Sequence, residues 1–425
     1  MTTQTSTTAL NWKTALFQDF GSHSAVSIIS SNNGLIKCQT LPTHEAAGRT
    51  PNHRAIFLDI TADDKLVMMD AESKKISIED TLPKDAFGIY YYPDNENNIM
   101  WATIDGDKKS GCDTLNCNPH SAPVIPIANE GILPKALKTI CLGRGHHVVC
   151  PTPKTSDNSS AKVFVSNLLD GSMSILNYDK TSPQFLTLID TLNLCQSEKE
   201  NNEFEKLPNN AFPHGMAYSP LTKRVYCLNN GYANINVINP DTLKIESTIE
   251  MKISSNLLLS PNGRYLIGKG ADRKSNPEHV LGRLCVVDVT TGNMNTILDL
   301  PDIYPSTYRF TPDGNKLYVT TAATGKGLQK ENLKYDILQV YDTSTLPKLK
   351  LIKEIKVGQG DCSRRSIAFL SIDGINQWVF NPNPSDGTLT VLNAHTDEIV
   401  ETLKVGEKNA KEVAFSYWNS CFYGA

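Results

Sequence analysis

The sequence lacks an excess of charge of either sign. Its 41 Lys and Arg residues are balanced by 45 Asp and Glu residues, which gives a formal net charge of -4 at pH 7. Because a nucleic-acid-binding protein gathers phosphate groups with a basic surface, we expect no nucleic-acid partner. Hydrophobic residues make up 40% of the 425 residues and charged residues 20%, as in a globular protein with a core. The chain is therefore long enough to fold as one large domain.

Long hydrophobic runs are also missing. The longest, such as residues 256–260 and 284–289, are far shorter than the roughly 18 to 20 residues that cross a bilayer, so we expect no membrane span. The N-terminus, MTTQTSTTALNWKTALFQDF, lacks the basic start and the apolar stretch of a secretory signal. On the sequence as given we expect a cytoplasmic protein, and an exported one if Met1 replaces a removed signal peptide.

Three familiar catalytic motifs are absent as well. The sequence contains no Gly-rich phosphate-binding loop, no Ser nucleophile elbow and no His-Glu-x-x-His helix. These absences disfavour the classical hydrolases.

The sequence does contain an internal repeat. Its clearest copy, residues 213–251, has four segments of alternating apolar and polar residues: HGMAYSP, KRVYCLNN, ANINVINPDT and LKIESTIEM. Gly, Asn, Asp and Pro stand at the turns between them. Related copies follow from residues 256, 308 and 366, and another precedes it from residue 145, so that the repeat is about 40 to 55 residues long.

Four-stranded repeats of this length predict an all-β fold, a β-propeller with seven or eight antiparallel blades. Seven is favoured, and the number depends on whether residues 54–83 form a complete blade. The C-terminal segment AKEVAFSYWNSCFYG supplies inner strands only, and AVSIISSNNGLIKCQTLP near the start can supply the outer ones. Pairing of the two ends would close the ring and remove free sheet edges. We expect an N-terminal extension at residues 1–22 and one propeller domain at 23–425.

Two segments resemble a known group of repeats. PDGNKLYVTTA and AKVFVSNLLDGSMSILNYD resemble the YVTN-type repeats of surface-layer-like and cytochrome d1-like propellers, over about three quarters of the chain. This resemblance implies the fold and says little about chemistry.

The start of each inner strand is the expected position of a site. In a propeller these starts meet at one mouth of the central channel, which is the default place for a ligand. The polar residues there are His146, His147, His214, Asn256, Tyr308, Arg309, Arg364, Arg365 and Glu412.

Several imidazoles near one axis could hold a metal. Neutral His nitrogens bind copper, zinc or iron, and the candidate ligands are His147, His214 and His53. Propellers of the nitrous oxide reductase and thiocyanate dehydrogenase type, which this chain resembles distantly, imply copper, although this sequence has fewer axial histidines. A channel lined by polar residues and water, without metal, is the alternative.

The run GRGHHVVCP is similar to the GxGPRHxxxxP blade start of lactonase and muconate-cyclising propellers, with His146 in place of the expected Arg. This resemblance implies a carboxylate substrate and no metal. Arg364 or Arg365 would then bind the anion through two hydrogen bonds, and His147 or Glu412 would transfer the proton. A place on the solvated rim, or a salt bridge to Asp361, is the alternative role for the arginines.

Cys112, Cys117 and His120 lie close together in a loop-like segment. Their spacing is not a standard zinc pattern, so a disulfide, free thiols and a metal knuckle all remain open.

Two functions from different classes follow. The first is a small-molecule or metal site at the channel mouth, which acts on a small anionic substrate if it is catalytic. The second is a scaffold that binds a protein partner through the long loops at residues 269–282 and 321–334. The first is favoured because the His and Arg residues gather at the strand starts.

Overall fold

A computed structural model of the chain supports a description of most residues. The described residues are 12–20, 23–32, 34–41, 44–45, 55–60, 66–70, 75–79, 90–104, 117, 121–128, 134–145, 147–156, 159–195, 210–251, 254–360, 364–365, 367–372, 374–415 and 422–423. They divide into two compact units. The first unit comprises residues 1–88, 336–338 and 355–425, and the second comprises 89–335 and 339–354.

The second unit contains four antiparallel sheets and most of a fifth, in chain order. The first sheet contains β8 (Tyr90–Asp94), β9 (Ile99–Thr103), β10 (Ala122–Ala128), β11 (Lys135–Ala136) and β12 (Ile140–Leu142). The other four are β13 (Val149–Thr152), β14 (Lys162–Asn167), β15 (Ser172–Asn177) and β16 (Leu188–Asn193); β17 (Pro213–Ser219), β18 (Arg224–Asn229), β19 (Asn234–Asn239) and β20 (Lys244–Glu250); β21 (Asn256–Leu259), β22 (Tyr265–Asp272), β23 (Leu281–Asp288) and β24 (Asn293–Pro301); and β25 (Pro305–Phe310), β26 (Lys316–Thr321), β27 (Ile337–Asp342) and β28 (Lys350–Lys356).

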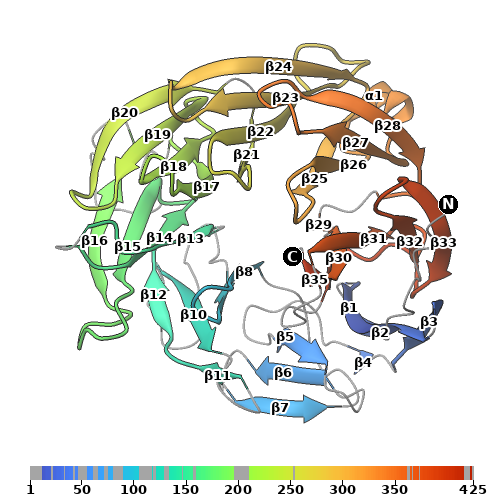
Figure 1. Cartoon of the computed structure of the whole chain (residues 1–425), viewed down its shortest axis with the longest axis horizontal. Coiled ribbons are helices and arrows are strands. Elements are labelled where there is room, and N and C mark those ends of the chain that lie inside the picture. Colours follow the sequence, from blue (N-terminus) through green and yellow to red (C-terminus); the bar gives the residue numbers. More distant parts are fainter. Residues whose placement is uncertain are drawn as a thin grey trace, which may run out of the picture. The chain divides into compact units, whose positions relative to one another are not determined.

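The four-stranded sheets of this unit share one orientation. Figure 1 shows their first strands, β13, β17, β21 and β25, on the inner side of an arc and their last strands, β16, β20, β24 and β28, on the outer side. A short helix, α1 (Leu328–Asn332), lies between β26 and β27. Among the described residues, no helix is long and apolar enough to cross a membrane.

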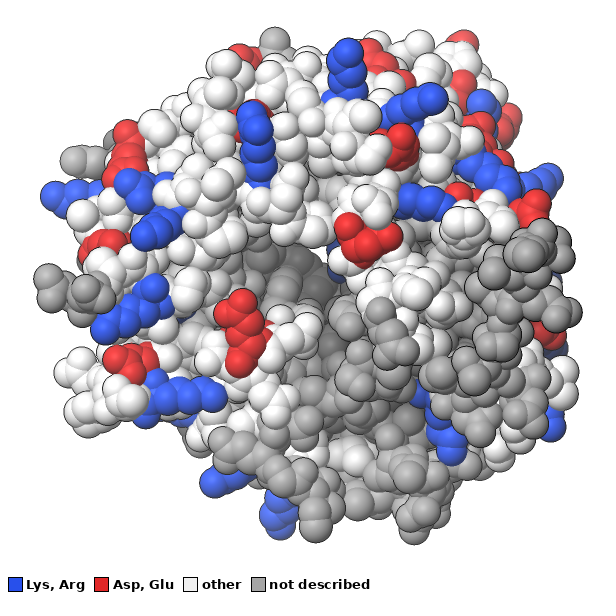
Figure 2. All heavy atoms as spheres, viewed as in Figure 1, with Lys and Arg blue, Asp and Glu red and all other residues white. Residues whose placement is uncertain are grey.

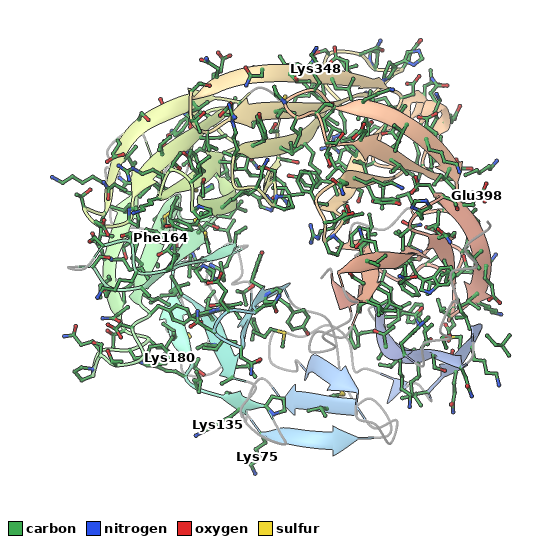
Figure 3. The ribbon with its side chains drawn as sticks, viewed as in Figure 1. Lys75, Lys135, Phe164, Lys180, Lys348 and Glu398 are labelled. Carbon is green, nitrogen blue, oxygen red and sulfur yellow. A yellow bond between two sulfur atoms is a disulfide. The ribbon has the colours of Figure 1, made fainter. Side chains whose placement is uncertain are left out.

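Strand β18 shows why the sheets stack face to face. Its side chains alternate between two cores: Val225 and Cys227 pack with Phe164 of the preceding sheet, whereas Tyr226 and Leu228 pack with side chains of the following sheet. Successive residues of a strand point to opposite faces, so a sheet with a neighbour on each side is apolar on both. Phe164, labelled in Figure 3, is fully buried in the first of these cores.

The first unit joins the two ends of the chain in one sheet. This sheet contains β1 (Trp12–Asp19), β2 (His23–Asn32), β3 (Leu35–Thr40), β4 (His44–Glu45), β29 (Arg364–Arg365) and β34 (Glu412–Phe415). Strand β34 pairs with β1, with Leu16 opposite Phe415. The predicted pairing of the chain ends is therefore confirmed. Strand β1 lies within the residues that the sequence assigns to an N-terminal extension.

The first unit also contains two further sheets. One contains β30 (Ala368–Ile372), β31 (Ile375–Asn383), β32 (Thr388–Asn393), β33 (Glu398–Lys404) and β35 (Phe422–Tyr423), and the other contains β5 (Ala55–Ile60), β6 (Leu66–Asp70) and β7 (Ile76–Glu79). The core between the first two sheets includes Trp12 and Phe380, whose ring centroids are 5.3 Å apart.

The chain is a β-propeller, as the repeat predicts. The described residues form eight sheets, of which seven have four or more strands and one, β5–β7, has three. The three-stranded sheet falls in residues 54–83, the segment on which the choice between seven and eight blades depends.

Candidate functional site

The predicted site residues of four successive sheets belong to the second unit. His147 precedes β13, His214 is the second residue of β17, Asn256 begins β21, and Tyr308 and Arg309 lie in β25. These are the inner first strands of the arc in Figure 1. His214 and Asn256 lie at the starts of their strands, as predicted, whereas Tyr308 and Arg309 are the fourth and fifth residues of β25 and lie further along it, because β25 already begins at Pro305.

His214 is half-buried and tied to the next sheet. Its Nδ1 lies 2.6 Å from the carbonyl oxygen of Ser255, which precedes β21. Because a carbonyl oxygen only accepts, Nδ1 carries the hydrogen, and in the neutral ring Nε2 is the basic nitrogen. This is the tautomer that a general base or a metal ligand needs.

Gly215 makes this contact possible. It has a φ of +106°, and a Cβ at this position would lie 2.6 Å from the backbone nitrogen of Leu257. A side chain here would push β17 away from β21 and break the His214–Ser255 hydrogen bond. The glycine is therefore required by both its conformation and the close approach of the two strands.

His147 has the same tautomer in a different setting. Its Nδ1 donates to the carbonyl oxygen of Ser166 over 2.9 Å, and its own carbonyl oxygen accepts from the Tyr92 hydroxyl over 2.6 Å. The exposed fraction of His147 is 0%. Burial favours a role in shaping the loop over direct contact with a ligand.

A buried ion pair stabilises the loop before β13. The Arg144 guanidinium contacts the Asp170 carboxylate at 3.0 Å, and the Arg144 backbone N–H donates to the same carboxylate over 2.6 Å. Gly145 has a φ of +111°, and a Cβ there would lie 2.5 Å from the backbone nitrogen of Leu169. Gly145 thus lets this loop pack closely on the turn between β14 and β15.

Lys269, on β22, is a site residue that the sequence analysis missed. It pairs in register with Asn256, and its ammonium nitrogen lies 5.7 Å from the centroid of the Tyr308 ring. Burial, and next the Arg309 guanidinium, lower the pKa of Lys269 to about 8. Its signal in the sequence is a lysine between two glycines, LIGKGAD, in an otherwise apolar strand.

Tyr308 and Arg309 are held on the next sheet. The Tyr308 hydroxyl donates to the carbonyl oxygen of Ile267 over 2.9 Å, and burial raises the pKa of this phenol. Arg309 Nη1 donates to the Tyr308 carbonyl oxygen over 3.0 Å. Lys269 and Tyr308 therefore face each other across two neighbouring sheets.

The remaining predicted residues belong to the first unit or lie outside the described residues. Strand β29 runs parallel to β34, which places Arg364 opposite Glu412 and Arg365 opposite Val413 in the backbone register. The roles predicted for Arg364, Arg365 and Glu412 stay predictions. His53, His146 and Asp361 lie outside the described residues.

The part of the chain that the structure describes gives no donor set for the predicted metal. Within the described ranges, no group of three or more His, Cys, Asp or Glu side chains is placed to hold a metal ion. His147 and His214 each bond a backbone carbonyl group of the chain. We therefore derive no chemical step through copper or iron.

One of the loop cysteines forms a disulfide. Cys117 is bonded to Cys141 of β12, with a Cα–Cα distance of 5.4 Å. Of the three alternatives left open for this segment, the disulfide is the one found for Cys117. Cys112 and His120 lie outside the described residues.

Charges are mixed on the outer surface of the second unit. Figure 2 shows Lys and Arg side chains interspersed with Asp and Glu side chains along the top and left of the view. The unit also contains the ion pairs Arg224–Glu246 and Arg264–Asp288. Lys135, Lys180 and Lys348, labelled in Figure 3, likewise point away from the inner side of this unit.

Comparison with solved structures identifies the fold. No protein-family model and no curated protein matches this chain. A protein from Lactobacillus plantarum matches with a TM-score of 0.55 and 15% identity, over 96% of this chain and 100% of its own. The periplasmic gluconolactonase of Pseudomonas aeruginosa matches with a TM-score of 0.55 and 12% identity, over 96% and 99%.

A third solved structure extends the comparison. The dihydro-heme d1 dehydrogenase NirN matches with a TM-score of 0.53 and 11% identity, over 92% of this chain and 73% of its own. The chain has the fold of lactonase-type and d1-type propellers. At these identities the likeness concerns the fold alone, and chemistry has to be argued from the residues.

Proposed function

We propose that this propeller is an enzyme that opens or closes the ring of a small, carboxylate-bearing lactone without a metal. The ligand would lie against the inner strand starts of the second unit. The observation that carries the proposal is that His214, Asn256 and Arg309 lie on the inner strands of three successive sheets of one unit. The same fold in a gluconolactonase supports this choice of reaction.

His214 is the proposed general base. Its Nδ1–H is engaged by the Ser255 carbonyl group, so Nε2 can take a proton from an attacking water. In ring opening, the water oxygen bonds to the lactone carbonyl carbon, the ring C–O bond breaks, and the ring oxygen takes up a proton. The product is a hydroxy acid, which ionises and releases one proton.

Arg309 is the proposed anchor for the carboxylate. A guanidinium binds a carboxylate through two parallel hydrogen bonds, which fixes orientation as well as position. The Tyr308 carbonyl group engages Nη1 of Arg309, and this contact holds the arginine at the inner edge of its sheet.

A lactone-hydrolysis assay tests this function. D-glucono-1,5-lactone and a carboxylate-bearing lactone are supplied, and acid release is followed with a pH indicator. We expect wild-type protein to exceed the buffer rate and His214→Asn to lose about 100-fold or more in kcat. His279→Asn is the matched control, because His279 is exposed and paired with Asp302. A wild-type rate equal to that of buffer, or equal losses in both variants, would reject the proposal.

The alternative function is a scaffold that binds a protein through the long loops. These loops contact each other: Gln329 donates to the carbonyl oxygen of Arg273 over 3.1 Å, and Asn332 donates to that of Glu278 over 3.0 Å. The two loops therefore form one packed surface. The scaffold function stays a prediction. The polar residues on the inner strands favour the small-molecule site.

A further inference from the structure

The side chain of Asn256 is oriented by its own strand. Its Oδ1 accepts a hydrogen bond from the backbone N–H of Leu257 over 2.7 Å. Because a backbone N–H only donates, this bond decides which arm of the amide is oxygen and which is nitrogen. The two N–H groups on Nδ2 of Asn256 therefore lie on the other arm, and the proposed reaction gives them no role.

The Asn256 amide lies at the junction of β17 and β21, which are neighbouring inner strands in Figure 1. Its Oδ1 is 3.0 Å from the position that a Cβ of Gly215 would occupy, and the backbone nitrogen of Leu257 is 2.6 Å from the same position. A side chain at residue 215 would therefore press on the Asn256 amide and on the group that orients it. Gly215 leaves room for this amide as well as for the His214–Ser255 bond.

His214 reaches the same junction. Its Nδ1 donates to the carbonyl oxygen of Ser255 over 2.6 Å, and the nitrogen of that peptide group belongs to Asn256. The imidazole and the amide side chain thus adjoin one peptide group, the first through a hydrogen bond and the second through its own Cα. A direct contact between the two strands therefore brings His214 and Asn256 together.

The amide nitrogen is the arm of Asn256 that can reach a ligand. Among the described residues, no group accepts a hydrogen bond from this Nδ2, and the side chain is half-buried. Lys269, which is opposite Asn256 in register, contacts the Tyr308 ring and has no acceptor to offer. An amide that is held by its oxygen keeps its N–H donors in place before the reaction, which is the condition for stabilising a developing negative charge.

We propose that Asn256 is the oxyanion donor of the site, and that its Nδ2 hydrogen-bonds the carbonyl oxygen of an ester or lactone. This inference rests on the proposed function for the reaction, and on the contacts of Asn256 for the binding of a carbonyl group. When the water oxygen bonds to the carbonyl carbon, the π pair of the C=O bond moves to the oxygen beside Nδ2. When the pair returns, the ring C–O bond breaks, and Asn256 has kept both hydrogens.

Substitution of Asn256 separates a donor from a structural residue. In Asn256→Asp the carboxylate still accepts from the Leu257 N–H but has no N–H of its own. We expect Asn256→Asp and Asn256→Ala each to lower kcat by about 100- to 1000-fold and to leave KM for the lactone nearly unchanged. An Asn256→Asp variant with the wild-type kcat would overturn the inference.

Asn262→Asp is the matched control for these variants. Asn262 lies in the exposed turn at the other end of β21, and its Oδ1 also accepts from a backbone N–H, that of Arg264, over 3.1 Å. We expect Asn262→Asp to keep the wild-type kcat. An equal loss in Asn262→Asp and Asn256→Asp would show a general effect of the added charge and would overturn the inference.

A bound lactam tests the donor without turnover. The probe is pyroglutamate, a γ-lactam that bears a carboxylate and resists ring opening, with a heavy isotope at its ring carbonyl carbon. Difference infrared spectroscopy records its C=O stretch on the full chain. Because a hydrogen bond polarises the carbonyl group, we expect a lower frequency on wild type and on Asn262→Asp than on Asn256→Ala. One frequency on all three proteins, or no binding of pyroglutamate to wild type, would overturn the inference.

The two proposals can fail separately. A carbonyl shift that depends on Asn256, without lactone hydrolysis, would reject the reaction and keep the donor. Hydrolysis that depends on His214, with an unchanged kcat in Asn256→Ala, would keep the reaction and reject the donor.

Discussion

Nη2 of Arg144 lies 3.0 Å from Oδ1 of Asp170, and the exposed fractions of the two side chains are 3% and 8%. Removing one partner of a buried pair leaves the other charge without compensation. We expect Asp170→Ala to lower the free energy of unfolding by about 3 to 5 kcal/mol, measured by urea denaturation. Glu246→Ala breaks the more exposed pair with Arg224 and should cost about 0.2 to 1 kcal/mol. Equal losses would show that burial of the Arg144 pair is unimportant.

The sheet that joins the chain ends should be essential for stability. Leu16 is fully buried on β1, the strand that lies between β34 and β2, whereas Leu35 of β3 is exposed. We expect Leu16→Ala to cost about 2 to 5 kcal/mol and Leu35→Ala less than about 0.5 kcal/mol. Thermal unfolding measures both.

Deletion of residues 1–22 tests the same sheet and the predicted extension together. Because β1 supplies the strand between β34 and β2, the shortened chain should lose cooperative unfolding. A shortened chain with the wild-type melting temperature would show that these residues are a dispensable extension.

Two turns of the same form differ in the residue that has a positive φ. Lys223 has a φ of +53° and Gly292 a φ of +70°, and each donates its N–H to the carbonyl oxygen four residues earlier. A left-handed conformation costs a residue with a side chain about 1 to 2 kcal/mol, partly offset by the extra entropy of an unfolded glycine. We expect Lys223→Gly to stabilise by about 0.5 kcal/mol and Gly292→Ala to destabilise by about 1 kcal/mol. Opposite signs in urea titrations would contradict this account of the turns.

The half-buried amine of Lys269 should leave a signature in the pH dependence of stability. The folded-state pKa of Lys269 is lowered to about 8, below its ordinary value of 10.5, so its charge opposes folding at pH 7. Between these two values the folded state has released the proton and the unfolded state retains it. The stability of wild type relative to Lys269→Met should therefore rise from about pH 8 to about pH 10.5. A difference that is constant across this range would mean that Lys269 titrates normally.

The repeat made the fold predictable because it is local in the sequence. The alternation of Val225, Tyr226, Cys227 and Leu228 is visible without coordinates, and it reports a strand buried on both faces. For residues 54–83, the same pattern does not decide whether the strands form a complete blade. Whether their strands complete a blade depends on pairings between segments that the pattern of one segment does not specify.

The site was less predictable because it depends on neighbours across sheets. His147 and His214 have the same place in their repeats, yet His147 is fully buried and His214 is not. Lys269 was missed because it lies on a second strand, and its proximity to Tyr308 arises only when two sheets stack. Cys117 likewise pairs with Cys141, which lies 24 residues away in another strand.

The central claim is that residues from different sheets of the second unit act on one ligand. A double-mutant cycle of His214→Asn and Arg309→Gln measures this directly, with kcat/KM for the carboxylate-bearing lactone as the readout. We predict that the double variant departs from the sum of the single effects by more than about 0.5 kcal/mol. Strict additivity of the two losses, within about 0.3 kcal/mol, would contradict a shared site.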